Sequence, residues 1–384
     1  MSNFPARTFS RPAFDVAFDA PAFVEAMLAF ERELAAAEEA EGLVPAGTGE
    51  AIARACARLR VDPAALAAEG KLSATLAVAL VRLLKEAVAA SDPGVERHVH
   101  FGATSQDVLD TAIALCLKPC LEEADRSLGT AVRSLARHAR EHRATPMLGR
   151  TLLQPAVAIT AGLRIARWAC ALAQDRERLA DAHASGLALQ LGGPVGDLAA
   201  LGSRGAAVRH RMALGLGLAD SPAWHVHRNA WLDLLGRMTH VVLTAGKIAR
   251  DVALAAQPEV GEMREAPPGE GGRSSAMPHK RNPVACAHAL AAATRAPGLL
   301  AIVHAGAASE QERGLGGWQA EIATVPEIAG ALGSSLDFLD TLGPGLVVDA
   351  ARMRANLEAH GPEGRAPDPA AAVDELLAGL TRYL

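Results

Sequence analysis

The fold is decided by residues Val241–Ala256, which read Val-Val-Leu-Thr-Ala-Gly-Lys-Ile-Ala-Arg-Asp-Val-Ala-Leu-Ala-Ala. The composition favours helix, and the apolar side chains fall on more than one helical face. Such a helix needs neighbours on several sides. The stretch therefore predicts a helix at the centre of a bundle or in an interface between copies of the chain.

Helical composition extends over most of the chain, in which aromatic residues make up only 3%. Shorter helices are expected at 23–41, 63–68 and 73–90, followed by a break at Ser91–Gly94. Helices well beyond the average of roughly 11–12 residues are expected at 106–142, 154–184, 223–257, 283–308 and 317–342. We therefore predict an all-α fold with a long central helical bundle.

The breaks divide the chain into three expected domains. Residues 1–97 form an N-terminal helical domain, and residues 98–342 form the central domain of long helices. Residues 343–384 form a C-terminal helical domain with a Pro- and Gly-rich stretch at 361–369 and one short final helix.

Composition limits the partners and the compartment. The net charge is −5 and no basic run occurs, which argues against a nucleic-acid partner. We expect no apolar stretch long enough to span a membrane, and residues 1–15 lack a secretory pattern. The five cysteines form no Cys-x-x-Cys pair, so buried reduced thiols are expected instead of a disulfide frame or a zinc site. These features predict a cytoplasmic protein, and because no cofactor motif is present, we expect that no metal or organic cofactor is required.

The chemistry is concentrated in residues 271–284, Gly-Gly-Arg-Ser-Ser-Ala-Met-Pro-His-Lys-Arg-Asn-Pro-Val. Glycines and prolines favour a non-helical loop that presents two hydroxyls beside a Lys-Arg pair. Pro283 can open the next helix, whose N-terminus would add positive potential. The loop therefore suits an anionic substrate, and a plain surface linker is the alternative.

Two further stretches carry candidate anion-binding groups. Residues 98–107 read His-Val-His-Phe-Gly-Ala-Thr-Ser-Gln-Asp, where Thr104 or Ser105 can cap the following helix beside His100 and Gln106. A helix cap without a ligand is the alternative there. Residues 149–154 read Gly-Arg-Thr-Leu-Leu-Gln.

Two other groups stay ambiguous from the residues alone. His225 and Arg228 lie close to an expected helix start, where packing is a better interpretation of a histidine than catalysis. Arg313 precedes a glycine-rich loop and would either bind a carboxylate with two hydrogen bonds or pair with Glu310 or Glu312.

Three of these stretches resemble the active-site regions of the fumarase/aspartase superfamily. Residues 271–284 are similar to its Gly-Ser-Ser-x-Met-Pro-x-Lys-x-Asn signature, with Arg273 in place of Gly. Residues 98–107 resemble His-x-Gly-x-Thr-Ser-x-Asp, and residues 149–154 resemble Gly-Arg-Thr-x-x-Gln. Together with 246–251 and 312–318, they are most similar to the superfamily's lactone-forming cycloisomerases, over roughly residues 10 to 350.

The resemblance implies a fumarase/aspartase-like homotetramer in which four chains pool their long helices and three chains contribute to each active site. The implied partner is a small polycarboxylate, bound without metal or cofactor. The resemblance assigns catalytic roles to Ser274, Ser275, Lys280 and His100. It assigns substrate contacts to Thr104, Ser105, Gln106, Arg150, Thr151, Gln154, Met277, His279, Arg281, Asn282 and Arg313.

Leu152 stands where many lyases of the superfamily carry a histidine that acts as general acid. Leucine cannot donate a proton, so elimination of a poor leaving group would lose its acid. A carboxylate that adds to a double bond of its own molecule has no external leaving group and loses nothing. In that reaction Ser274 would transfer the proton, while Lys280 and Asn282 would stabilise the developing charge.

Other departures keep two alternatives open. Arg273 adds bulk to the loop, Gln311 and Gln319 replace expected histidines, and the C-terminal domain is shorter than in the family. One alternative is a β-elimination lyase that releases fumarate from a succinyl-type substrate. The other is a catalytically inactive structural homologue, against which Ser274, Lys280 and Asn282 argue.

Overall fold

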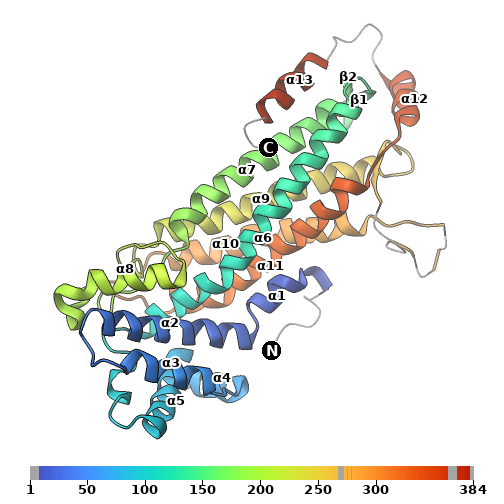
Figure 1. The fold of residues 1–384 in the computed structure, drawn as a ribbon. Helices are drawn as coiled ribbons and strands as arrows, with labels where there is room; N and C mark the ends of the chain where they lie inside the picture. Colours follow the sequence, from blue (N-terminus) through green and yellow to red (C-terminus); the bar gives the residue numbers. More distant parts are fainter. Residues whose placement is uncertain (1–7, 267–271, 275, 278, 362–369, 381–384) are drawn as a thin grey trace.

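The computed structural model describes residues 8–266, 272–274, 276–277, 279–361 and 370–380. Within these residues the body of the molecule consists of long helices that lie side by side along one axis (Figure 1). They are α6 (Ser105–Glu141), α7 (Ala161–Gly186), α9 (Asn229–Ala255), α10 (Val284–Gly306) and α11 (Gly317–Gly345). The predicted all-α fold with a long central bundle is confirmed.

The helices α6, α9 and α11 run in one direction, and α7 and α10 run in the other. At one end, Trp318 near the start of α11 donates to Asp110 near the start of α6. At the opposite end, the Ser134 hydroxyl of α6 donates to the Gly343 carbonyl of α11 at 2.7 Å. We call these ends the head, where α6 begins, and the tail, where it finishes. With 37 residues, α6 is about 55 Å long.

Short helices from two parts of the chain gather at the head, at the lower left of Figure 1, except α1 (Pro12–Ala17), which lies beside the middle of the bundle, where Arg11 at its start bonds Glu123 of α6 and Asp340 of α11. Asp19, Asp62 and Thr75 cap three of them, since each side chain accepts from a backbone N–H of the first turn. The elements at the head are α2 (Ala20–Ala40), α3 (Thr48–Arg58), α4 (Pro63–Ser73), α5 (Leu76–Ser91), η2 (Glu96–His98), η3 (Ala199–Arg204) and α8 (Gly205–Leu216).

The tail carries a β-hairpin where a helix was expected. The hairpin pairs β1 (Pro146–Thr151) with β2 (Gln154–Thr160), so the predicted helix at 154–184 begins only at Ala161. Proline and β-branched residues in β2 favour a strand, and Thr160 then caps α7. The other tail elements are β3 (Met263–Glu265), which pairs with β4 (Leu346–Val348), and the helices α12 (Ala350–His360) and α13 (Ala370–Gly379).

Other boundaries also differ from the predictions. The helix expected from 223 begins at Asn229, after a turn that places Trp224 and Arg228 in the core. The described residues include α3 and α8, which were not predicted, and two C-terminal helices where one was expected. The division into domains at 97 and 342 stays a proposal.

The helix α10 differs from the prediction that no apolar stretch is long enough to span a membrane. By length and composition it is the single candidate among the described residues for crossing a membrane, so the prediction that no stretch is long enough is wrong. Alanine and leucine make it apolar on all sides, and it packs against α9 and α11. All five cysteines are free; Cys170 is half-buried and the others are buried.

Candidate active site

The head of the bundle brings Arg313 to the start of α6. Its Nη1 donates to the Thr104 hydroxyl at 3.1 Å, and its Nη2 donates to the Pro194 carbonyl at 3.1 Å. No ion pair joins Arg313 to Glu310 or Glu312 among the described residues. A fixed guanidinium therefore adds to the positive potential at this helix N-terminus, as an anion site requires.

His100 lies one loop before this helix and has a backbone φ of 64°. Its Nδ1 lies 2.7 Å from Oε1 of Glu31, a residue of α2 that is 1% exposed. Burial opposes the charged imidazole, but attraction to Glu31 and the hydrogen bond with it outweigh burial and raise the pKa of His100. The ring is thus favoured as a cation beside the α6 N-terminus.

The next residues of the site are Ser105, Gln106 and Asp107, in the first turn of α6 at the head. Ser105 opens the helix and is half-buried, whereas Gln106 is buried and its Nε2 donates to Asp110 and to the His225 carbonyl, both at 3.2 Å. Asp107 accepts from Gln190 Nε2 at 2.8 Å and from three backbone N–H groups, those of Thr104, Gly192 and Gly193. Burial raises the pKa of Asp107 to about 6, although these hydrogen bonds oppose the rise.

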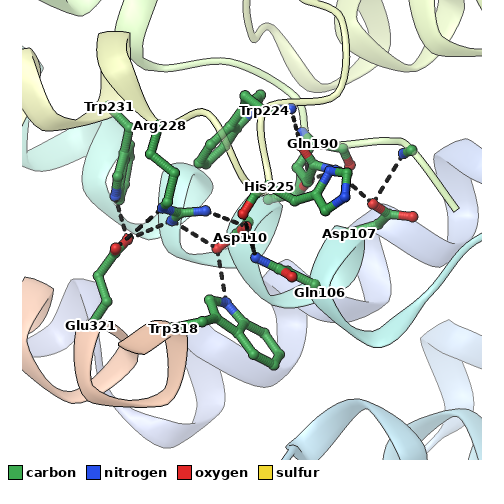
Figure 2. A network of polar contacts seen from close by, with 12 residues as sticks. Gln106, Asp107, Asp110, Gln190, Trp224, His225, Arg228, Trp231, Trp318 and Glu321 are labelled. Atoms are coloured by element: carbon green, nitrogen blue, oxygen red, sulfur yellow. Dashed lines mark hydrogen bonds and ion pairs between the residues drawn. The ribbon is translucent and has the colours of Figure 1, made fainter. Parts of the chain in front are cut away.

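Next to these residues, Arg228 lies between Asp110 of α6 and Glu321 of α11 (Figure 2). Trp231 and Trp318 donate to the same two carboxylates. Burial opposes the charge on Arg228, but the two carboxylates outweigh it and raise its pKa. Sequence reasoning missed the role of both acids, although Asp110 lies one turn after Gln106 and Asp107 on the same face of α6.

His225 is buried beside this network, which fits the packing role favoured from the sequence. Burial, followed by the charge of Arg313, lowers its pKa. The ring is therefore favoured in its neutral form.

The tail holds the other predicted residues. Arg150 of β1 makes two hydrogen bonds, of 2.9 and 3.0 Å, to the fully buried carboxylate of Glu262. Thr151 and Gln154 are exposed and paired across the hairpin turn. Beside them lies a cavity of about 810 Å³, whose lining includes Arg150, Arg164, Arg167 and Lys247.

The tip of the hairpin consists of Leu152 and Leu153, with φ values of 50° and 64°. The two side chains are 96% and 73% exposed. Left-handed backbone is unfavourable for leucine, and two exposed leucines in succession gain nothing within the chain. This strained apolar tip is therefore shaped for a contact outside its own chain.

The serine loop also belongs to the tail. Ser274 Oγ accepts from the N–H of Met277 at 3.1 Å and from that of Ala276 at 3.4 Å. The loop is closed by Asn282, whose N–H donates to the Gly272 carbonyl at 2.7 Å. A side chain at Gly272, where φ is 79°, would stand 2.5 Å from the Asn282 carbonyl oxygen, so glycine is required.

The cations of this loop face solvent within the single chain. Lys280, His279, Arg281 and Met277 are exposed, Asn282 is half-buried, and Ser275 lies outside the described residues. Pro283 is the residue before α10 and not its first residue. Two N–H groups at the start of α10, expected to favour a substrate, are already taken by the Glu265 carboxylate at 2.9 and 2.8 Å.

One group of described residues has the ligands and spacing to hold a metal ion: His138, Glu141 and His142, near the tail end of α6. His138 Nε2 already hydrogen-bonds the Gly343 carbonyl at 3.0 Å. None of the three belongs to a predicted site region. The expectation that the site needs no metal or organic cofactor stays a prediction.

The predicted residues thus form two sets near opposite ends of α6, which is about 55 Å long. The head set contains His100, Thr104, Ser105, Gln106 and Arg313. The tail set contains Arg150, Thr151, Gln154, Ser274, Met277, His279, Lys280, Arg281 and Asn282. One chain cannot place both sets around one small molecule.

Comparisons with known proteins place these features in a family. A family described as lyases matches residues 13–298. The 3-carboxy-cis,cis-muconate cycloisomerase of Bradyrhizobium diazoefficiens is 44% identical over 365 residues, which cover 94% of this chain and 80% of the relative. The nitrosuccinate lyase of Streptomyces davaonensis is 38% identical over 350 residues, which cover 88% of this chain and 73% of the relative.

Solved structures give the same picture. The 3-carboxy-cis,cis-muconate lactonizing enzyme of Pseudomonas putida superposes with a TM-score of 0.86 at 36% identity, covering 98% of this chain and 87% of that one. A fumarate lyase of Mesorhizobium superposes with a TM-score of 0.82 at 28% identity, covering 97% and 83%. The fumarase/aspartase-like fold predicted from the sequence is confirmed.

Proposed function

Since this chain belongs to the lyase family, we propose that it is a cycloisomerase that converts 3-carboxy-cis,cis-muconate to 4-carboxymuconolactone. The observation that carries the proposal is the 44% identity to a cycloisomerase of that substrate over 94% of the chain. The exposed Leu152 agrees with it, because ring closure needs no acid for a leaving group. The reaction belongs to the protocatechuate branch of aromatic degradation, and we place the enzyme in the cytoplasm.

The reaction is an isomerisation that breaks no bond to an external leaving group, and with an ionised substrate it takes up one proton. A carboxylate oxygen forms a bond to a carbon of its own molecule's double bond, and the π electrons move to the carbon beside another carboxylate. A proton donated by the enzyme then bonds to that carbon, so the trianionic substrate becomes a dianionic lactone, and the enzyme takes up one proton from solvent to restore its donor. Because the nucleophile is tethered, the protein mainly supplies orientation and charge.

Ser274 is the proposed proton donor, and Ser275 is its neighbouring alternative. The two N–H groups that point at Ser274 Oγ would stabilise this oxygen after it gives up its proton. Lys280 and Asn282 lie in the same loop and would hold the negative charge that develops on the substrate. His100 would bind a carboxylate as a cation from the head.

The remaining substrate contacts follow from the two sets. At the head, Thr104, Ser105 and Gln106 surround the α6 N-terminus, beside the fixed guanidinium of Arg313. At the tail, the proposed contacts are Arg150, Thr151, Gln154, Met277, His279 and Arg281. Three carboxylates on one small substrate need this much positive charge from both ends.

The enzyme is proposed to work as a homotetramer with shared sites, in which three chains contribute to each site. The distance between head and tail supports this, because antiparallel copies would bring one chain's head beside another chain's tail. Exposed leucines also support it: Leu152 at the tail and Leu315 at the head are 96% and 90% exposed. The long helix α10 keeps an apolar face, including Ile302, that lacks cover within the chain.

The test is to mix the purified protein with 3-carboxy-cis,cis-muconate and to follow loss of the diene's ultraviolet absorbance. Ser274→Ala should abolish the decay without changing the assembly measured by light scattering. Ser73→Ala, at the exposed end of α4, which carries no predicted site residue, is the matched control and should keep full rate. Full rate in Ser274→Ala would show that another group transfers the proton.

A second candidate is β-elimination of a good anionic leaving group from a succinyl-type substrate, with release of fumarate. It is favoured by the 38% identity to a nitrosuccinate lyase and by Leu152, which excludes an acid for amine leaving groups at that position. Fumarate release without any decay of the muconate would select this function over the cycloisomerase.

A further inference from the structure

The charge of His100 is governed from a helix far away in the sequence. Glu31 lies 69 positions earlier, on α2, and its Oε1 is 2.7 Å from His100 Nδ1. Glu31 is 1% exposed, and its Oε2 has no hydrogen-bond partner among the described residues. Among the described residues, His100 is therefore the side chain that hydrogen-bonds this buried carboxylate.

This contact decides which ring nitrogen carries a proton. A carboxylate only accepts hydrogen bonds, so Nδ1 of His100 carries the proton that faces Glu31. Nε2 is then the nitrogen left for a ligand. With φ at 64°, the His100 backbone is in a conformation that few residues adopt, and the contact to α2 holds the ring there.

The charged groups around the ring favour the cation. Burial opposes its charge, while Glu31 from α2 and Asp107 from α6 attract it, and Lys85 from α5 repels it. The attraction prevails, so the pKa of His100 is raised. The imidazolium consequently persists to higher pH than an ordinary histidine would.

A second acid on the same helix does not compete for this role. Glu38 lies seven residues after Glu31, two turns along α2, and is fully buried. Burial first, and the charge of Glu31 second, raise the pKa of Glu38 to about 9. Glu38 is therefore neutral at pH 7, and His100 faces a single carboxylate charge on this helix.

We propose that Glu31 is a positioning residue for the cycloisomerase: it fixes the His100 ring through Nδ1–H and keeps Nε2–H as a charged donor for a substrate carboxylate. A charge-assisted bond of this kind is roughly twice as strong as a neutral one. The inference rests on the proposed function of the head set. It adds a residue from α2, a helix that contributes none of the motif stretches.

Glu31→Gln tests it, because the amide oxygen can still accept from Nδ1–H but carries no charge. The pKa of His100 is read from the pH dependence of its modification by diethyl pyrocarbonate, which attacks the neutral ring, with the modified residue located by mass spectrometry. The midpoint should fall by about one unit or more. Glu38→Gln is the matched control, since it removes a buried acid that is already neutral. The midpoint of His100 modification in this variant should equal that of the wild type.

Activity gives a second readout that a purely structural role would not move. If a charged His100 binds substrate, kcat/KM falls as pH rises through its pKa. A lower pKa of His100 moves this fall to lower pH. The decrease in kcat/KM of Glu31→Gln relative to the wild type should therefore be about tenfold greater at pH 8 than at pH 5, mostly through a higher KM. Glu38→Gln should keep the wild-type profile, and in a His100→Asn background Glu31→Gln should add no further pH dependence.

The outcomes separate the two proposals. An unmoved modification midpoint in Glu31→Gln overturns the inference, whatever the activity. A lowered midpoint in a protein whose wild type does not consume the muconate overturns the proposed function and leaves the Glu31–His100 pairing standing. If Glu31→Gln does not fold, the wild type still decides: a His100 midpoint at or below that of the exposed His360 overturns the inference.

Discussion

Replacing Arg228 by methionine should destabilise the protein strongly at neutral pH. Arg228 is 4% exposed, and its guanidinium makes two hydrogen bonds to Asp110, of 2.8 and 3.1 Å. It also contacts Glu321, and its Cζ lies 4.6 Å from the centre of the Trp224 ring. Methionine fills similar space but leaves two buried carboxylates, from α6 and α11, without the cation between them.

The size of the effect follows from burial. Removing one partner of a buried ion pair costs about 3–5 kcal/mol. At about 2.1 cal/mol/K per residue, the 384 residues give an unfolding entropy of about 0.8 kcal/mol/K. The expected fall in the thermal midpoint at pH 7 is therefore about 4–6 °C.

The effect should depend on pH in a defined direction. Burial raises the pKa of Glu321 even though Arg228 opposes the rise. A carboxyl group whose folded pKa is raised contributes stability below its unfolded pKa, and that stability is lost as pH rises through the folded value. Removing Arg228 raises the folded pKa further, so the deficit of the variant should shrink between pH 7 and pH 5.

Thermal unfolding followed by circular dichroism at fixed protein concentration measures both effects. Arg82→Met is the matched control: its pairs with Glu69 and Glu86 are exposed, so the midpoint should barely move. The double variant Arg228→Met/Glu321→Leu should recover part of the loss. A deficit below about 1 °C at pH 7, or one that grows toward pH 5, would refute the reasoning.

Three other substitutions test local features. Gly272→Ala should lower kcat/KM on the order of a hundredfold at an unchanged thermal midpoint, because its Cβ would displace the serine loop by clashing with the Asn282 carbonyl; a normal rate would contradict this. Leu152→Asn combined with Leu153→Gly suits the positive φ at both positions, but it should weaken the assembly measured by light scattering, because it removes the two exposed leucines proposed to contact another chain; an unchanged assembly would contradict that contact. Glu265→Gln should cost about 1 kcal/mol by weakening the cap of α10, whereas Glu259→Gln on the surface should not, and equal effects would argue against the cap.

The long helices were predictable because their signals are local. The helix predicted at 106–142 is observed as Ser105–Glu141, and its start is marked by the cap residue Thr104. Within Val241–Ala256, several faces are indeed covered. The same reasoning wrongly predicted a helix at residues 154–160. These residues form a strand because they pair with β1, and this pairing between two segments is not visible as a local preference.

The site shows the same limit more sharply. Its motif stretches were visible in the sequence, but their acidic partners were not, because each pairing joins residues far apart in the chain. Glu31 reaches His100 across 69 positions, and Glu262 reaches Arg150 across 112. The separation of the head from the tail was likewise invisible, since it depends on which way each helix runs.

These pairings also determine which cations of the site are available to bind a substrate carboxylate. Arg150 gives two hydrogen bonds to a carboxylate that is fully buried, and withdrawing them would leave that charge unpaired at a large cost. Only its remaining N–H groups are free for a ligand. Arg313 and Lys280, by contrast, form no ion pair among the described residues. Under the proposed function, the charge available for a polycarboxylate therefore comes from Arg313 and the imidazolium of His100 at the head and from the serine loop at the tail, so full neutralisation would need more than one copy of the chain.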